Sequence, residues 1–225
     1  MKSQIIFEDN HLLVINKKVG QLVQGDKTGD ESLLELIKDF IKKRDQKPGN
    51  VFLGLVHRID RPTSGLVIYA KTSKALTRLT QMVKNREIQK TYWAIVPKEM
   101  IPQNQRLVHY LAKNEKSNKA TVFPRATEGA KEAILTYNII KVFDNYQLLE
   151  IDLETGRHHQ IRAQLAKTGV PIKGDLKYGS PRSNPDGGIS LHARKLKFIH
   201  PVTKEKLELT APVPQNDAVW RACED

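Results

Sequence analysis

The spacing of hydrophobic residues changes early in the chain, and it predicts a hairpin followed by a helix. Two apolar runs, residues 5–7 and 12–15, flank Asp9 and Asn10, which is typical of two strands joined by a tight turn. From Ser32 the apolar residues recur every three or four positions up to Ile41, which indicates an amphipathic helix. Asp30 or Ser32 would cap this helix, and the KPGN sequence would end it.

The rest of the chain is predicted to consist mainly of strands, with two more helices. Short apolar runs predict strands at residues 51–56, 66–70 and 91–96, and an amphipathic pattern predicts a helix from Ser73. Residues 107–153 contain the strand-like segments ATVF, AILTYNIIKVF and YQLLEIDL. A short helix is expected over residues 157–167, and strands return in ISLHARKLKFIH and KLELT.

This order of elements favours an α+β fold with a mostly antiparallel sheet, because consecutive strands outnumber helices. A doubly wound sheet would alternate strands and helices throughout. No repeat or low-complexity linker divides the chain, so we expect one domain over residues 1–225.

The charge of the chain indicates a polyanionic partner. Lys and Arg number 37 against 25 Asp and Glu, which gives a formal net charge of +12. A basic but merely solvated surface would have the same composition. Cys223 is the only cysteine, which excludes an internal disulfide, and no apolar stretch is long enough for a signal peptide or a membrane span. We therefore expect a soluble cytoplasmic protein that binds nucleic acid.

The segment HRIDRPTSG, residues 57–65, is the first that suggests chemistry. It lies between two predicted strands, where functional loops are commonly held. Asp60 stands between Arg58 and Arg61, and neighbouring positive charge favours an ionised carboxylate, which can act as a nucleophile or a base. A simple turn in which Asp60 pairs with an arginine remains an alternative.

The segment TGRHHQIRAQL, residues 155–165, is the second. Thr155 is expected to cap a helix that carries Arg157, His158, His159 and Arg162, and a basic helix N-terminus is a suitable phosphate site. No second cluster with ligand spacing accompanies the two histidines, so we expect no metal. A solvated basic helix is the alternative.

The segment QKTYWAIV, residues 89–96, places Tyr92 and Trp93 in a predicted strand. Alternation sends the two rings to opposite faces, so one would enter the core and the other could stack on a base. The spacing does not distinguish them, and both rings could be structural.

Together these three segments resemble the RluA-type RNA pseudouridine synthases. HRIDRPTSGLVIYAKT is similar to the family's segment around its catalytic aspartate, and TGRHHQIRAQLAKTGVPIKGDLKYG is similar to its second signature. The opening IIFEDNHLLVINK and the closing LHARKLKFIHP match as well, so the resemblance covers nearly the whole chain in the expected order.

The resemblance implies the pseudouridine synthase fold, a mixed and largely antiparallel sheet with a central cleft. It also implies an isomerase that needs no cofactor and converts uridines of ribosomal or transfer RNA into pseudouridine. Asp60 would be the catalytic aspartate, Tyr92 would pack against the target base, and Arg162 would pair with Asp60. Arg58 would fill the gap left by the flipped nucleotide. Further RNA contacts are expected at His57, Arg61, Arg157, His159 and Lys173. Other basic residues expected to contact phosphates are Lys71, Lys74, Lys167, Lys177, Arg182 and Arg194.

Three departures from the family pattern stand out. The family usually has Lys-Pro-x-Gly after the first hairpin, and here Lys18 stands in place of the proline. Gln164 stands where the family usually has a histidine, which puts a secondary RNA or helix contact in doubt. The pattern starts at Ile5, so we expect no RNA-binding domain of the S4 type before it. We expect a monomer that selects RNA with its own surface.

Two other functions compete with this interpretation. A non-catalytic RNA-binding or ribosome-assembly protein with the same fold would be expected to lack Asp60 or Arg162, and both are present. A hydrolase using Ser64, His57 and Asp60 would need a nucleophile elbow of the G-x-S-x-G kind, which does not surround Ser64.

Overall fold

The structure is a computed structural model that describes residues 1–26 and 29–224. The chain forms two compact units, and each is assembled from segments that are distant in the sequence. The first unit contains Met1–Ile88 and Ala193–Pro214, and the second contains Gln89–His192 and Gln215–Asp225. A single domain over residues 1–225 stays a prediction.

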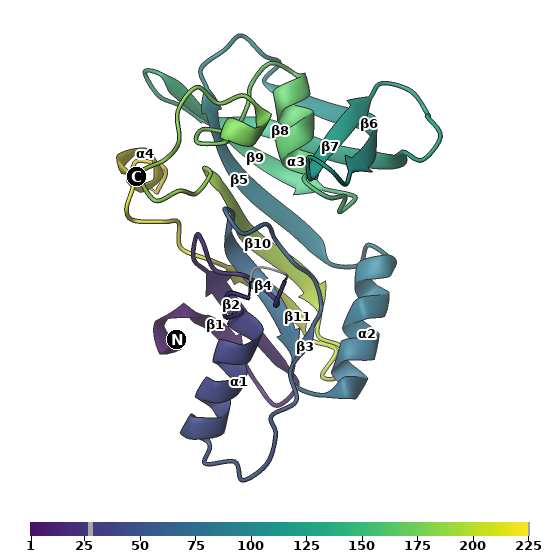
Figure 1. Ribbon diagram of the computed structural model, residues 1–225, viewed down its shortest axis with the longest axis vertical. Helices are drawn as coiled ribbons and strands as arrows, with labels where there is room; N and C mark the ends of the chain where they lie inside the picture. Colours follow the sequence, from purple (N-terminus) through teal and green to yellow (C-terminus); the bar gives the residue numbers. More distant parts are fainter. Residues whose placement is uncertain (27–28, 225) are drawn as a thin grey trace. The chain divides into compact units, whose positions relative to one another are not determined.

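The first unit contains strands in the order β1-β2-β4-β10-β11, in which β3 also pairs with β4 (Figure 1). The pairs β1–β2, β2–β4, β3–β4 and β10–β11 are antiparallel. Its strands are β1 (Ile5–Glu8), β2 (Leu12–Lys17), β3 (Gly54–Leu55), β4 (Ser64–Ala70), β10 (Leu191–Ile199, from Ala193 onward) and β11 (Lys206–Thr210). The predicted opening hairpin is confirmed, with the Asp9 carboxylate accepting hydrogen bonds from the backbone of the turn. The predicted strand at residues 51–56 is wrong over most of its length, because only Gly54 and Leu55 pair with β4.

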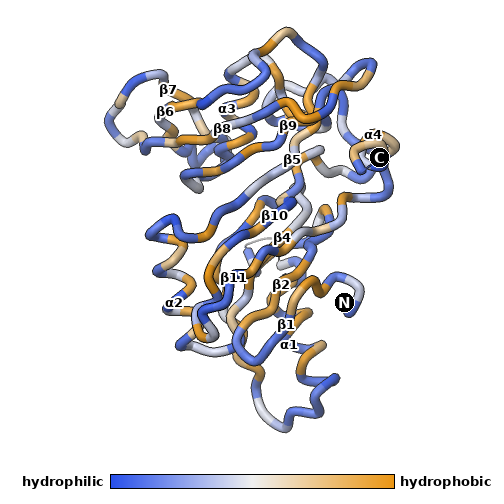
Figure 2. The backbone as a smooth tube through the Cα atoms, turned by 180° about the vertical axis from the view of Figure 1, so that it is seen from behind, coloured by the Kyte–Doolittle hydropathy of each residue, from blue (hydrophilic) through white to orange (hydrophobic). Residues whose placement is uncertain are grey.

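Two helices bury apolar side chains in this unit. They are α1 (Leu33–Arg44), capped by Ser32, and α2 (Ser73–Lys84), capped by Thr72, and a short 3-10 helix, η1 (Lys2–Gln4), precedes β1. The predicted helices are therefore confirmed, and Ser32 rather than Asp30 supplies the first cap. One face of the sheet packs against α2 through a cluster that includes Leu12, Ile68 and Leu79. Figure 2 shows hydrophobic positions concentrated along the strands.

The second unit contains an antiparallel run of strands in the order β5-β9-β8-β6-β7. These are β5 (Gln89–Pro97), β6 (Asn104–Asn114), β7 (Lys119–Phe123), β8 (Lys131–Val142) and β9 (Tyr146–Leu153). The predicted β-rich region is thus confirmed. Helix α3 (Gln160–Lys167) contacts β6 and β7, and Ala163 packs with Leu111, Ala120 and Ala133 in a small core.

The start of α3 differs from the prediction. The helix begins at Gln160 rather than at residue 157, and its N-cap is His159, in the left-handed conformation with φ 51° and ψ 27°. Thr155 does not cap the helix, since its hydroxyl donates to the Gln160 side chain and accepts from the Ile134 backbone. Arg157 and His158 therefore lie in a turn before the helix, and not on a helical face with Arg162.

Two short elements complete the second unit: the 3-10 helix η2 (Leu176–Tyr178) and helix α4 (Ala218–Arg221). Trp220 is buried in α4, and its ring lies 5.9 Å from that of His192, so it anchors the C-terminal segment. Over the residues that the structure describes, none of the helices is long and apolar enough to cross a bilayer.

Candidate active site

The three residues assigned to catalysis divide between the two units. Asp60 belongs to the first unit, and Tyr92 and Arg162 belong to the second. Each group of residues is held by contacts within its own unit.

The Asp60 loop connects β3 to β4 and is fixed at both ends. The backbone N–H of Thr63 donates to the Asp60 carbonyl at 3.0 Å, which closes a turn just before β4. At the other end, the backbone N–H of Ile68 donates to Nε2 of His57 at 3.2 Å. This bond requires an unprotonated Nε2, so His57 is held as the neutral tautomer with its proton on Nδ1. His57 therefore supports the loop, which is a role that sequence reasoning did not assign.

Lys17, at the end of β2, is a buried cation next to this loop. Its side chain has no exposed surface, and its ammonium donates to the carbonyl oxygens of Lys18 and Arg61, both at 3.0 Å. Burial lowers the pKa of Lys17 to about 7, and the negative charge of Asp60 opposes that shift. Lys17 thus ties the Asp60 loop to β2 through its hydrogen bond to Arg61.

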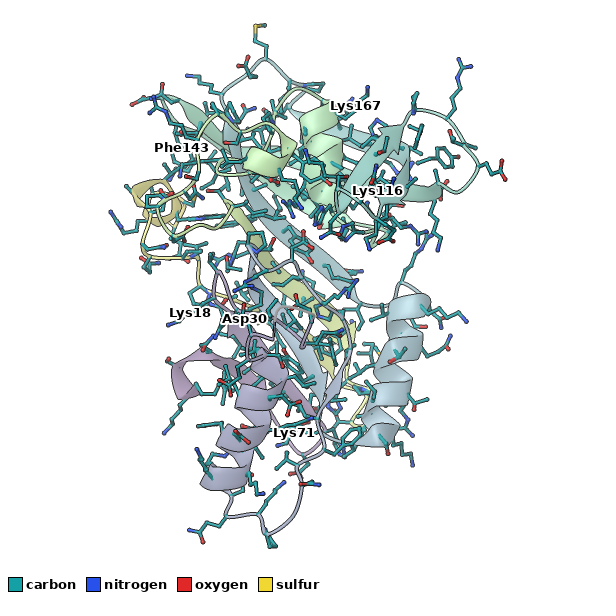
Figure 3. All side chains as sticks on the ribbon, in the orientation of Figure 1. Lys18, Asp30, Lys71, Lys116, Phe143 and Lys167 are labelled. Carbon is teal, nitrogen blue, oxygen red and sulfur yellow. The ribbon has the colours of Figure 1, made fainter. Side chains whose placement is uncertain are left out.

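Arg61 is oriented by the neighbouring loop. Its Nε donates to the Gly20 carbonyl at 3.0 Å, and its Nη1 lies 2.8 Å from the Asp30 carboxylate, labelled in Figure 3. The backbone N–H of Gly20 in turn donates to the Arg61 carbonyl at 3.0 Å. These bonds fasten the Asp60 loop to residues 18–20, whereas Arg58 projects from it and is exposed.

Arg162 forms a buried ion pair with Asp175. Nε and Nη2 of the arginine donate to the two carboxylate oxygens at 2.7 and 2.9 Å, and the side chains are 5% and 1% exposed. The Tyr178 ring lies 5.1 Å from the guanidinium carbon, a distance that gives a cation–π contact. Two charge-assisted hydrogen bonds and an aromatic face therefore fix the direction of Arg162. Its predicted pairing with Asp60 stays a prediction.

Tyr178 connects this ion pair to the turn that precedes α3. Its hydroxyl accepts from the Ala120 N–H at 2.7 Å and lies 2.9 Å from Nδ1 of His159. The His159 and His158 rings stack with their centres 3.8 Å apart. A buried histidine in the left-handed conformation is strained, and such strain persists only where surrounding contacts enforce it. The turn at residues 156–159 is thus held in one shape.

Tyr92 is the buried member of the aromatic pair in β5. Its side chain is 8% exposed, whereas Trp93 is half-buried and donates its indole N–H to Glu150 at 3.1 Å. The two rings lie on opposite faces, as the alternation predicts. Stacking of Tyr92 on a base stays a prediction.

Several residues expected to contact RNA already have protein partners. Lys173 pairs with Asp217 and also donates to Asn184, and Arg157 donates to the Glu132 carbonyl at 2.7 Å. Among the other basic candidates, Lys71 pairs with Glu8 and Arg194 donates to the Ala211 carbonyl, whereas the exposed ones are Lys74, Lys167 and Arg182.

Gln164, which replaces the family's histidine, lies in the core of the second unit. It has no exposed surface, and its amide nitrogen donates to the Ala133 carbonyl at 3.2 Å and lies 3.0 Å from Nδ1 of His109. Its contacts are therefore between helix and sheet. The doubt left by the sequence is resolved against an RNA contact at this position.

Sequence reasoning missed Lys17, Asp175 and Tyr178 as parts of the site. Asp175 and Tyr178 stand in the segment GDLKYG, which was matched to the family without any role for its side chains. A signal was available, because an aspartate and a tyrosine in a glycine-bounded segment after a predicted basic helix are candidate partners for its arginine.

Comparison with known proteins decides the family. A family model described as RNA pseudouridylate synthase matches residues 11–167. The chain belongs to the RNA pseudouridylate synthase family. Enzymes of this family are isomerases that convert uridine in RNA to pseudouridine.

Curated relatives of this synthase match along nearly its whole length. It is 32% identical over 221 residues to the uncharacterized RNA pseudouridine synthase YlyB of Bacillus subtilis, covering 97% of this chain and 71% of that protein. It is 34% identical over 219 residues to ribosomal large subunit pseudouridine synthase C of Vibrio vulnificus, covering 95% and 66%. The chain thus spans about two thirds of the length of these relatives.

A solved structure supports the predicted fold. Human RNA pseudouridylate synthase domain containing 4 superposes with a TM-score of 0.79 at 23% identity, covering 95% of this chain and 90% of that one. The α+β pseudouridine synthase fold inferred from the sequence is therefore confirmed.

Proposed function

We propose that this protein isomerises uridines of ribosomal RNA to pseudouridine, with Asp60 as the catalytic carboxylate. The observation that carries the proposal is the position of Asp60 in a loop fixed at both ends, in a chain whose family makes this modification. Relatives named ribosomal large subunit pseudouridine synthases C and D support large-subunit RNA as the substrate. Transfer RNA is the alternative substrate, and we expect a cytoplasmic monomer.

The reaction breaks the N1–C1′ bond, rotates the uracil and rejoins it through C5, so no group enters or leaves. Asp60 could attack C1′, remove the C2′ proton, or attack the base. In each case the carboxylate must be ionised and aimed, and Lys17 helps to hold the loop that carries it. Arg162, held by Asp175, is proposed as the second cation that acts on Asp60.

A uridine stacked in RNA must leave the stack before it can react, at a cost of a few kcal/mol. We propose that Tyr92 packs on the flipped base, which would offset about 1–3 kcal/mol of that cost. Arg58, exposed on the Asp60 loop, is proposed to fill the vacated position. RNA contacts at His57, Arg61, Arg157 and His159 stay proposals, and the same residues hold the two loops through contacts within the protein.

The decisive experiment measures tritium release from a large-subunit ribosomal RNA transcript labelled at uridine C5. We expect release by the wild type and none by Asp60→Asn, which keeps the shape of the side chain but removes its charge. Asp144→Asn is the matched control, because it makes the same change at an exposed turn residue. RNA binding without release by the wild type would favour the rival function of a non-catalytic RNA-binding protein.

A further inference from the structure

Lys90, near the start of β5, is a partly buried lysine without a side-chain partner among the residues that the structure describes. Its side chain is partly buried, and burial lowers the pKa of its ammonium. Within residues 1–26 and 29–224 it makes no hydrogen bond or ion pair with another side chain. An ammonium that loses water without gaining a counter-ion weakens the folded state. Such a residue is retained more readily where an anion arrives from outside.

The strand register explains why Lys90 has no carboxylate nearby. On one face of the β5–β9 pair, Thr91 donates to Asp152 and Trp93 donates to Glu150. Lys90 alternates with Thr91 and therefore points to the opposite face, together with Tyr92. There Tyr92 stands opposite Ile151, which is itself opposite Tyr137 in β8. The carboxylates of these strands thus lie on one face and Lys90 on the other.

The Lys90 ammonium lies beside a glycine that is itself exposed. A Cβ built on Gly156 would lie 3.9 Å from the Lys90 ammonium, and no other atom outside its chain neighbours would lie within 4 Å. Gly156 itself is exposed. Gly156 carries no side chain that would cover the Lys90 ammonium, so an anion can approach it from this side.

We propose that Lys90 binds a backbone phosphate of the RNA substrate next to the uridine held by Tyr92. Residues two apart in a strand are separated by roughly 6.6 Å. This spacing is comparable to the distance from base to phosphate within one nucleotide. Stacking at Tyr92 would then bring a phosphate oxygen to the Lys90 ammonium, which donates to it. The inference rests on the proposed function, and it adds the residue that fixes the position of the target nucleotide's backbone.

Binding to a fluorescein-labelled single-stranded oligouridylate tests the contact directly. We expect Lys90→Met to weaken binding about tenfold, because it removes a charge-assisted hydrogen bond. The slope of log affinity against log salt should fall by about 0.7. Lys90→Arg keeps the charge and should retain most of the affinity. Lys98→Met is the matched control, because Lys98 follows the other end of β5 and is exposed.

Two further measurements separate binding from a structural role. Lys90→Met should unfold at the same urea concentration as the wild type or a higher one, since it removes a buried charge. Gly156→Ala should also weaken binding, although its Cβ makes only an ordinary contact with Lys90 and leaves the fold intact.

The pH dependence gives a third measurement. Burial lowers the pKa of Lys90, so its ammonium loses its proton at a lower pH than an exposed lysine does. The affinity of the wild type for RNA should therefore begin to fall at that lower pH. Lys90→Arg should lack this early loss, because arginine stays protonated.

Equal affinity and equal salt slope for Lys90→Met and Lys98→Met would overturn the inference. A loss of binding that accompanies a loss of stability in Lys90→Met would also overturn it. If the wild type is active and Lys90→Met changes neither turnover nor binding, the phosphate contact is refuted and the proposed function is not. A wild type that releases no tritium but binds through Lys90 would reject the catalytic proposal and support the contact.

Discussion

The buried pair of Arg162 and Asp175 allows a sharp test of how the second unit is held together. Asp175→Asn preserves the shape of the side chain but removes the carboxylate charge that pairs with the Arg162 guanidinium, which is only 5% exposed. Removing one partner of a buried hydrogen-bonded ion pair typically costs about 3–5 kcal/mol. With a urea dependence of roughly 2 kcal/mol per molar, the unfolding midpoint should fall by about 1.5–2.5 M.

The assay is urea unfolding followed by tryptophan fluorescence. The chain contains two tryptophans, Trp93 and Trp220, and both lie in the unit that contains the ion pair. Their emission therefore reports on this unit. The slope of the transition should stay the same, because the change affects stability and not the surface exposed on unfolding.

The control is the exposed pair of Arg106 and Glu154 in the same unit. Two nitrogens of this arginine also donate to both carboxylate oxygens, at 3.0 and 3.1 Å, but the side chains are 53% and 40% exposed. Glu154→Gln should move the midpoint far less, because water screens the exposed charges. Equal shifts for the two substitutions would refute the reasoning that burial makes the Asp175 carboxylate necessary.

The double variant Arg162→Met, Asp175→Leu completes the test. Replacing both charges with apolar groups of similar size should restore most of the stability lost in Asp175→Asn. Tritium release should not return, since the proposed function requires the arginine. Recovery of both stability and activity would show that Arg162 is not needed for the chemistry.

Three further predictions concern the first unit, and urea unfolding measures each of them. The unfolded chain keeps the ordinary lysine pKa, so between pH 7 and 10.5 it binds more protons than the folded protein, in which the pKa of Lys17 is about 7. The free energy of unfolding of the wild type should therefore rise with pH over this window. Lys17 contributes about 4–5 kcal/mol to that rise, and Lys17→Met should lack this contribution. Gly65→Ala should lower the free energy of unfolding by roughly 2–5 kcal/mol, because φ at this position is 111° and the new Cβ would lie 2.4 Å from the Ala193 carbonyl oxygen. An unchanged midpoint of urea unfolding would contradict this close approach. Arg44 lowers the pKa of Glu8 to about 2, so this pair stabilises the fold above pH 4.5 and is lost as the pH falls through 2. Glu8→Gln should remove this loss of stability in acid, which is roughly 2 kcal/mol once screening by water is allowed for. If the variant lost stability in acid to the same extent as the wild type, the role of this pair would be refuted.

Local chemistry in the sequence was sufficient for most elements of the fold. The turn at Asp9, the cap at Ser32 and the alternation through Tyr92 and Trp93 depend on residues within a few positions of one another. Such short-range preferences can be read directly from the chain. The family resemblance extended this reading to the fold, because it drew on several long segments in order.

The two errors in the secondary structure arose where distant residues compete for the same backbone. Only Gly54 and Leu55 of the predicted strand at 51–56 pair with β4, and β10 takes another part of β4 at Gly65 and Ala193. Helix α3 starts late because the hydroxyl of Thr155, expected to be its cap, is engaged by the Ile134 backbone in β8.

The sequence by itself determined the family, the order of strands and helices, and the candidate carboxylate at Asp60. Only the tertiary structure decided which charges are paired. Asp175 lies thirteen residues beyond Arg162, and Lys17 lies far from the Asp60 loop, yet each reaches its partner through folding. The same holds for Lys90, whose lack of a carboxylate follows from the register of β5 against β9. The sequence shows which side chains carry charge. Burial and strand register determine which of these charges are paired within the protein and which remain available for RNA.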